Sequence, residues 1–390
     1  MILTIFTYLS FLLFSFGQLG RISFFGQQIN FYLYELCLLL ALFSFSIKYG
    51  VKPIFYALNK FRILFIFLFY LLISFLVGTG KFTPFENFIG VLYWLRLTIY
   101  FLFFIYLNYH LKKQPVFVNT LKKGFNIFVS LTLITSIVQY FYYPDLRNLI
   151  YAGWDPHLYR IFGTFLDTSI AGAIYGLIFI TLFLKDDELI NNKWINLSLT
   201  GMYMLLIVLT YSRALYLAIL FILMLQTVTQ KRFKTIILLI LFFITLIFLA
   251  PKPFGEGVNL SRIFSLKSRW VDYQVGTKIW EKNPILGIGY NRIRYSKLKL
   301  NIIEAVGSDI THSGASFHSS FLTVLVSGGI IGLILFLLVL LKFAKINLFS
   351  RNLVIFLSLF SLSDNVLLHP FLLLLLLTLI PIFSINPSRK

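Results

Sequence analysis

Residues 316–336, SFHSSFLTVLVSGGIIGLILF, decide the fold class of this chain. Its polar start gives way to an apolar run long enough to cross a bilayer, which takes about 20 helical residues. Similar runs recur along all 390 residues, of which 59% are hydrophobic and 12% are charged, whereas soluble domains are about one quarter charged. The sequence therefore predicts an all-α polytopic membrane protein, with His318 at the mouth of one span.

About twelve transmembrane helices are expected from the apolar runs. They cover roughly 2–17, 30–47, 61–77, 90–109, 124–143, 169–184, 196–211, 213–229, 233–250, 317–341, 348–363 and 367–385. Residues 196–229 would form one helix of about 50 Å at ~1.5 Å per residue, too long for a hydrocarbon core of about 30 Å. We therefore predict two short helices with a turn at 211–213, and a similar turn at Asp364-Asn365.

The basic residues predict the orientation of these spans. With both ends in the cytoplasm, the inner segments carry 18 Lys and Arg, and the short outer segments carry only Arg21, Lys81, Arg147, Arg160 and Arg213. Basic residues concentrate in short cytoplasmic loops of membrane proteins. The formal net charge of +20 is thus explained by the membrane, and we expect no nucleic-acid partner.

Four regions follow from this topology: N-terminal spans in 1–150, further spans in 151–250, a large outer loop in 251–316, and C-terminal spans in 317–390. Within the loop, SRWVDYQVGTKIWEKNP (268–284) sets aromatic residues among charges. That pattern is typical of an amphipathic helix lying on a bilayer surface. The following ILGIGYNRIRY predicts a glycine-marked turn.

The distinctive polar residues fall at one level, the outer membrane face. Arg160 precedes one span, Arg213 occupies the predicted turn, Arg269 starts the surface helix and His318 starts a span. Four more candidates for the same cleft are Glu35, Arg96, Asp167 and His312. Each arginine has an ordinary alternative, since arginine near an interface often reaches toward lipid headgroups, and a histidine at a helix mouth is often a cap.

The residue types indicate the chemistry. There is no D-x-D, HExxH, cysteine pair or phosphate-binding loop, so we predict neither a metal nor a cofactor. Guanidinium groups bind phosphate oxygens with two parallel hydrogen bonds, and a neutral imidazole can accept a proton from a hydroxyl near neutral pH. Transfer of a group from a pyrophosphate to a hydroxyl needs both functions: a cation that binds the leaving phosphate and a base that accepts the hydroxyl proton.

Four stretches in order resemble one family. RIFGTFLDTSIAG (160–172), YSRALYLA (211–218), SRWVDYQVGTKIWEKNPILGIGYNRI (268–293) and FHSSFLTVLVSGGIIGLILF (317–336) are similar to the signature segments of the bacterial O-antigen ligase and O-antigen polymerase family. Gly329 and Gly332 fill the family's Gly-x-x-Gly. One departure is Ser319, where members often have asparagine. The resemblance covers roughly 155–340.

The resemblance implies a C-type glycosyltransferase fold in the bacterial inner membrane, with the active site on the periplasmic face. It implies an undecaprenyl-pyrophosphate-linked glycan as donor and a sugar hydroxyl as acceptor. Arg160, Arg213 and Arg269 would bind the pyrophosphate, and His318 would be the general base. A chain-length regulator is a further expected partner.

Two activities share this chemistry and differ in the acceptor. A polymerase adds the chain to the next lipid-linked repeat unit, and we favour it because of NPILGIGY and the modest length. A ligase would transfer the glycan to lipid A core. A protein-directed oligosaccharyltransferase ranks third, since such members of the family tend to be longer. A flippase is an alternative from another class, but transporters place charges near the bilayer midplane and show repeated halves, which this sequence lacks.

Overall fold

The structure is a computed structural model. It describes residues 2–152, 154, 157–190, 192–229, 233–251, 253, 256–260, 263–302 and 314–384. Long helices dominate the first part of the chain: α1 (Ile2–Ser15), α2 (Leu33–Tyr49), α3 (Lys52–Lys60), α4 (Arg62–Val77), α5 (Pro84–Lys113), α6 (Phe117–Tyr142) and α7 (Thr168–Leu184). The second part has α8 (Asp186–Leu189), α9 (Lys193–Leu209), α10 (Arg213–Thr229), α11 (Phe233–Leu249), α12 (Phe264–Glu281), α13 (Ile293–Lys299), α14 (Ser320–Ala344), α15 (Leu348–Phe360) and α16 (Pro370–Ile382).

Each of the twelve predicted spans corresponds to a helix, and the chain turns between α9 and α10 and between α15 and α16 as predicted. Within the described residues, three helices are long and apolar enough to cross a membrane: α5, α6 and α14. The pair α2 and α3, bent by 98°, would make a fourth. Eight further apolar helices have 10–17 residues, so the chain is a helical membrane protein and the number twelve stays a prediction.

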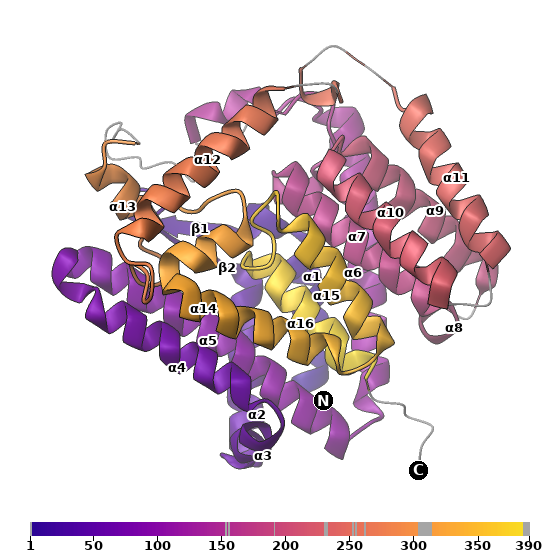
Figure 1. Cartoon of the computed structure of the whole chain (residues 1–390). Helices are drawn as coiled ribbons and strands as arrows, with labels where there is room; N and C mark the ends of the chain where they lie inside the picture. The colour runs from indigo at the N-terminus through magenta and orange to yellow at the C-terminus, as the bar shows by residue number, and fades with distance from the viewer. Residues whose placement is uncertain are drawn as a thin grey trace.

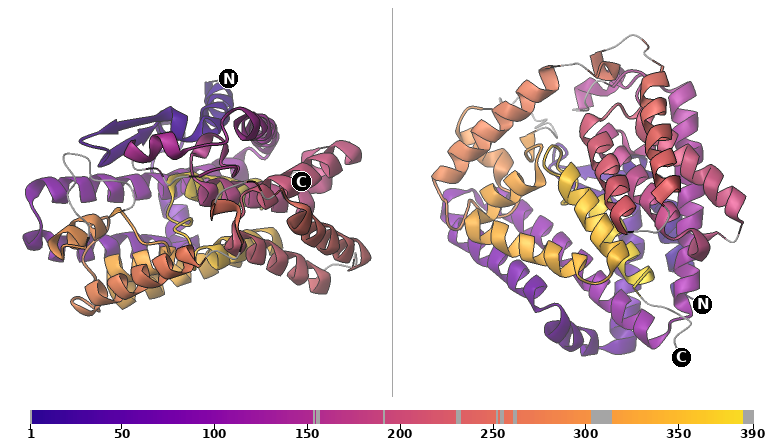
Figure 2. Two further views of the ribbon diagram at one scale, coloured as in Figure 1. Left: turned by 90° about the horizontal axis from the view of Figure 1, so that it is seen from above. Right: turned by 45° about the vertical axis from the view of Figure 1, so that its right-hand side comes forward.

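The all-α prediction needs one correction. Strands β1 (Arg21–Phe24) and β2 (Ile29–Tyr32) form an antiparallel hairpin with Arg21 opposite Tyr32. Its loop contains Phe25, Gly26 and Gln27 in left-handed backbone conformations, which allow the chain to reverse within four residues. Figure 2 (left) shows the hairpin beside α1, outside the long helices.

The helices form two sides with α15 and α16 between them. Figures 1 and 2 show α4, α5 and α14 on one side, and α7, α9, α10 and α11 on the other. Helix α14 packs on α4 and α15, α10 packs on α15, and α16 packs on α5 and α7. Helix α12 lies against α14. Residues from α7, α12, α14 and the turn between α15 and α16 therefore meet where the two sides join.

Helix α14 is broken in its middle, which the uninterrupted apolar run did not predict. Gly329 has φ 64° and ψ −170°, a combination that is essentially restricted to glycine. The backbone of 284–289 fills the break: Ile288 N–H donates to the Val326 carbonyl at 3.0 Å, and Ile330 N–H donates to the Pro284 carbonyl at 2.9 Å. The glycine-marked turn and the Gly-Gly pair thus form one interlocked unit.

This interlock leaves no room for side chains at its centre. A Cβ atom on Gly329 would lie 2.0 Å from the Ile285 carbonyl oxygen, and one on Gly287 would lie 2.5 Å from Gly329 N. The Tyr70 hydroxyl of α4 donates to the carbonyls of Gly328 (2.7 Å) and Ile285 (3.0 Å). The break is therefore clamped from both sides, and the first half of α14 is held in a fixed direction.

A small separate core supports the start of α14. Ile279 of α12, Ile288 and Ile293 pack with Phe317, Leu322 and Val326. Phe317 is 1% exposed, so its backbone is anchored directly before His318. The neighbouring side chain can then be presented from a rigid support.

Candidate functional site

His318 is held by a carboxylate that the sequence reading did not single out. Its Nδ1 lies 2.5 Å from Oδ2 of Asp272, and its backbone N–H donates to the same oxygen at 2.8 Å. Two contacts to one oxygen fix the imidazole and make Nδ1–H the donor when the ring is neutral. Nε2 then carries the lone pair, on a side chain that is 46% exposed. A ring oriented in this way can accept a proton from a bound hydroxyl.

The carboxylate also sets the basicity of the ring. The hydrogen bond to Asp272 raises the pKa of the His318 imidazole above its ordinary value, against the opposing effect of burial. Burial works to raise the pKa of the Asp272 carboxyl, but the hydrogen bond from His318 and the charge of Lys297 outweigh it, so that pKa is lowered. Asp272 is therefore a carboxylate near neutral pH, and it favours the protonated form of its partner.

Lys297 of α13 braces this pair. Its Nζ lies 3.5 Å from Oδ1 of Asp272 and donates to the Ser316 carbonyl at 2.9 Å. It also lies 4.3 Å from the centre of the Phe317 ring. One buried cation thus ties the carboxylate of α12 to the segment that carries His318.

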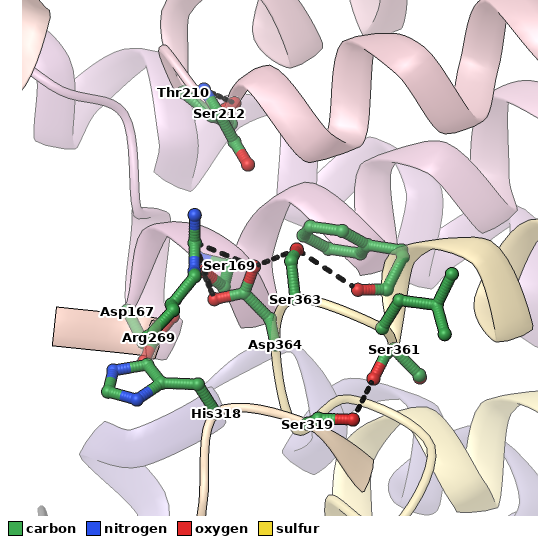
Figure 3. Close-up of polar contacts among 12 residues, drawn as sticks. Asp167, Ser169, Thr210, Ser212, Arg269, His318, Ser319, Ser361, Ser363 and Asp364 are labelled. Atoms are coloured by element: carbon green, nitrogen blue, oxygen red, sulfur yellow. Dashed lines mark hydrogen bonds and ion pairs between the residues drawn. The ribbon is translucent and has the colours of Figure 1, made fainter. Parts of the chain in front are cut away.

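A second charged group lies beside this pair (Figure 3). Arg269, one turn before Asp272 on α12, contacts both carboxylate oxygens of Asp364, at 3.3 and 3.0 Å. Asp364 also accepts hydrogen bonds from the Ser169 hydroxyl of α7 (2.9 Å) and the Ser363 hydroxyl (2.8 Å). The cluster therefore links α7, α12 and the turn between α15 and α16.

Arg269 retains donors after these contacts. A guanidinium has five N–H donors, and the contacts with Asp364 use only its NH2 nitrogen. Its Nε is buried and has no partner among the described residues. The charges of Arg269 and Asp364 both act on the pKa of His318. The guanidinium with unused donors is therefore close enough to the imidazole to interact with it electrostatically.

Ser319, the departure from the family pattern, caps α14. Its hydroxyl accepts from Leu322 N–H at 3.4 Å and donates to the Ser361 carbonyl at 3.0 Å. Ser320 adds a bond from its hydroxyl to Asn365 Oδ1 at 2.9 Å. These bonds fasten the start of α14 to the 361–365 turn, and Asp272 orients His318.

Arg160 and Arg213 lie near the turn between α9 and α10. The Arg160 Nε donates to the Thr210 carbonyl at 2.8 Å, and Arg160, which is buried, also contacts Nδ1 of His157 at 3.4 Å. Arg213 opens α10 and donates from NH1 to the Leu260 carbonyl at 3.1 Å. Figure 3 places the 210–212 turn on the opposite side of the Arg269–Asp364 ion pair from His318.

The four further cleft candidates have different surroundings. Asp167 caps α7, accepting from the N–H groups of Ser169 (2.6 Å) and Ile170 (2.9 Å), and so lies two residues from the Asp364 contact. Glu35 accepts from Arg96 Nε at 2.6 Å and from the Tyr32 N–H at 2.9 Å. His312 lies outside the described residues.

The residues missed by the sequence reading are Asp272, Lys297 and Asp364. Asp272 follows Arg269 by three positions, the spacing that places two side chains on one helix face, and this signal was present in SRWVDYQ. Asp364 was recognised only as a turn residue. No sequence pattern pointed to Lys297, since its partners Asp272 and Ser316 lie in other elements. Within the described part of the chain, no three His, Cys, Asp or Glu side chains are grouped closely enough to hold a metal ion.

Comparison with known families adds an independent finding. No curated protein matches the chain. The family model described as O-antigen ligase matches residues 197–337, just over a third of the chain. This stretch contains Arg213, Arg269, His318 and the Gly329 break, whereas Arg160 lies before it. Over residues 197–337 the chain is similar to the O-antigen ligase family, which confirms the resemblance to the O-antigen ligases and polymerases seen in the sequence.

Proposed function

We propose that this chain is a glycosyltransferase of the inner membrane that polymerises undecaprenyl-pyrophosphate-linked oligosaccharide repeat units at the periplasmic face. The observation that carries the proposal is the pairing of His318 with Asp272 beside the Arg269–Asp364 cluster. An oriented base and a guanidinium with a free N–H are the two groups that transfer from a pyrophosphate donor requires.

In the proposed reaction, a hydroxyl of the acceptor sugar attacks the anomeric carbon of the donor glycan. The new glycosidic C–O bond forms as the bond from that carbon to the pyrophosphate oxygen breaks. The hydroxyl proton passes to Nε2 of His318, and the resulting imidazolium is stabilised by Asp272. The undecaprenyl pyrophosphate leaves with both bonding electrons, and inversion at the anomeric carbon follows from direct displacement.

The arginines would neutralise the charge that grows on the leaving group. The guanidinium of Arg269 would offer the N–H donors that Asp364 does not use, while the contact with Asp364 fixes its direction. Arg160 and Arg213 would contribute from the other side of the site, from the segments around the 210–213 turn. Pre-oriented cations of this kind are the largest contribution to many transfer reactions, and no metal or cofactor is part of the proposal.

The test is reconstitution of the purified protein in bilayers with the lipid-linked oligosaccharide from its source bacterium. A ladder of products in the absence of lipid A core is expected of a polymerase. Product that forms only when core is supplied would replace the polymerase by a ligase. Translocation of the lipid without any new glycosidic bond would overturn the transferase proposal.

Arg213 gives a test of the donor site. Lysine keeps the positive charge but cannot form two parallel hydrogen bonds to a phosphate, so Arg213→Lys should weaken donor binding. Unchanged affinity and turnover in this variant would remove Arg213 from the pyrophosphate site.

A further inference from the structure

The hairpin β1–β2 carries its apolar side chains on the outside. In the register of its two strands, Ile22 lies opposite Phe31, and Phe24 lies opposite Ile29. Alternate side chains of a strand point to one face, so these four residues form an apolar face. Ile22 is 44% exposed and Phe24 is 51% exposed. An antiparallel sheet at a protein surface usually packs its apolar face on the core, so this hairpin is arranged the other way round.

The opposite face of the hairpin is the one that the protein holds. Tyr32 is buried, and the centre of its ring lies 4.7 Å from the centre of the Phe371 ring of α16. Its strand partner Arg21 places its guanidinium 5.0 Å from the centre of the Trp154 ring. These contacts fix which face points outward, and the hairpin cannot turn over to bury its apolar face.

The end of the hairpin is tied to the elements around the candidate site. The Tyr295 hydroxyl of α13 donates to Oε1 of Gln28 at 2.9 Å, and the Tyr93 hydroxyl of α5 donates to the Gln28 carbonyl at 3.1 Å. Helix α13 also carries Lys297, which contacts the partner of His318. The hairpin therefore lies at the same end of the helices as His318.

The apolar face continues into the apolar surface of the neighbouring helices. The ring of Phe25, at the hairpin loop, lies 5.3 Å from the ring of Phe85 at the start of α5. Phe85 and Phe88 of α5 are exposed, as is Leu36 of α2, the helix that directly follows the hairpin. In a helical membrane protein the exposed apolar side chains of such helices face acyl chains. The hairpin therefore extends a surface that contacts lipid.

The backbone of the hairpin determines the depth at which it can lie. The sheet has two strands, so within the described part of the chain one edge of each strand has no backbone partner. Open sheet edges do not occur in the hydrocarbon region, where no water can satisfy them. Residues 21–32 also contain one arginine and no acidic residue, so no carboxylate of the hairpin repels lipid phosphates. Its backbone therefore belongs at the level of the headgroups.

We infer that the hairpin is an interfacial anchor whose partner is the phospholipid of the leaflet on the His318 side of the membrane. Its apolar face enters the boundary between headgroups and acyl chains, about 5–10 Å deep, as the apolar face of an amphipathic helix does. Through Gln28, the anchor sets the level of α13 relative to the bilayer. This inference requires a chain inserted in a membrane and does not rest on the proposed reaction.

The test is the depth of a fluorescent label on each face of β1, with the full chain in nanodiscs of phosphatidylcholine and phosphatidylglycerol. Cys37 is the single cysteine of the chain and is buried, so every variant carries Cys37→Ala. Phe24→Cys places the label on the apolar face. Ser23→Cys, one residue before it on the opposite face, is the matched control. Ile22→Cys repeats the measurement on the apolar face, so that this face is still tested if Phe24→Cys does not fold.

A label at 24 should be quenched by a nitroxide near the carbonyl end of the lipid acyl chain, and quenching by iodide in the water should be severalfold weaker than at 23. Equal quenching by iodide at both positions would overturn the inference, since the apolar face would then lie in water. Protection from iodide and from lipid nitroxides alike would also overturn it, because a second copy of the chain or another protein segment would then cover the face. Strongest quenching by a nitroxide near the methyl end of the acyl chain would refute the interfacial depth.

Discussion

The bond between Asp272 and His318 gives the most direct test of the site. Asparagine at 272 keeps an oxygen that accepts from Nδ1 at 2.5 Å and from the backbone N–H at 2.8 Å, but it removes the negative charge. A hydrogen bond to a charged group contributes about 1.5–3 kcal/mol, and a neutral one about 0.5–1.5 kcal/mol. Because the imidazole is 46% exposed, the lower ends of both ranges apply, and they differ by about 1 kcal/mol. Asp272→Asn should therefore lower kcat/KM at neutral pH about fivefold.

The pH profile of kcat/KM shows in which direction Asp272 shifts the pKa of His318. A general base must be neutral to work, so kcat/KM falls as the pH drops through the pKa of His318. Since Asp272 raises that pKa, the acid limb of the unaltered chain should lie above the ordinary value for histidine. In Asp272→Asn the limb should move to lower pH. A limb at the same or higher pH would refute the assignment of Asp272 as the partner of the base.

A control variant and a second measurement test whether the shift in the acid limb comes from the bond between Asp272 and His318. Asp145 pairs with Arg147 at 2.7 Å on the surface, so Asp145→Asn should leave the acid limb in place. If Asp272→Asn is too slow to assay, the pH dependence of His318 modification by diethyl pyrocarbonate reports the same pKa. That measurement also shows the shift when turnover is absent.

Three further predictions concern the base, the cation and the interlock. His318→Ala should lower kcat about 10²–10⁴-fold with little change in the unfolding temperature, since the side chain is half exposed, whereas a flippase would keep most of its function. Arg269→Lys should raise the donor KM at least tenfold, measured in the reconstituted assay, and an unchanged KM would remove the residue from the donor site. Gly329→Ala should destabilise the chain by about 3 kcal/mol or more because its Cβ would lie 2.0 Å from the Ile285 carbonyl oxygen. In thermal unfolding, Gly332→Ala is the control, because its nearest contact is a Tyr70 ring carbon at 3.3 Å.

Much of the fold could be predicted because hydropathy acts locally. Every predicted span is a helix, and the turns at 211–213 and 364–365 lie where the length argument placed them. The break in α14 could not be predicted in this way. It depends on the backbone of 284–289 replacing helical hydrogen bonds, and no property of the run SGGIIG by itself requires that partner.

The residue types of the candidate site could be predicted from the sequence, because histidine and arginine each indicate a particular chemistry. A histidine at a helix mouth and arginines at the predicted outer face were visible in the sequence, but their carboxylate partners were not. Asp364 and Lys297 contact the site only because α12 packs on α14 and the turn after α15 meets α7. Such contacts join positions up to 195 residues apart, beyond any sequence period.

The interlock at Gly329 and the orientation of His318 belong to one arrangement. The 284–289 turn enters the break in α14, and the same segment leads from α12, which carries Asp272, to α13, which carries Lys297. Both ends of this segment therefore bring a charged side chain to the pair that holds the imidazole. A displaced turn would move Asp272 and Lys297 relative to His318 even with every catalytic residue present. In the proposed mechanism the two glycine motifs therefore act on catalysis through geometry, since the segment that joins α12 to α13 is bonded to α14 at the glycine break.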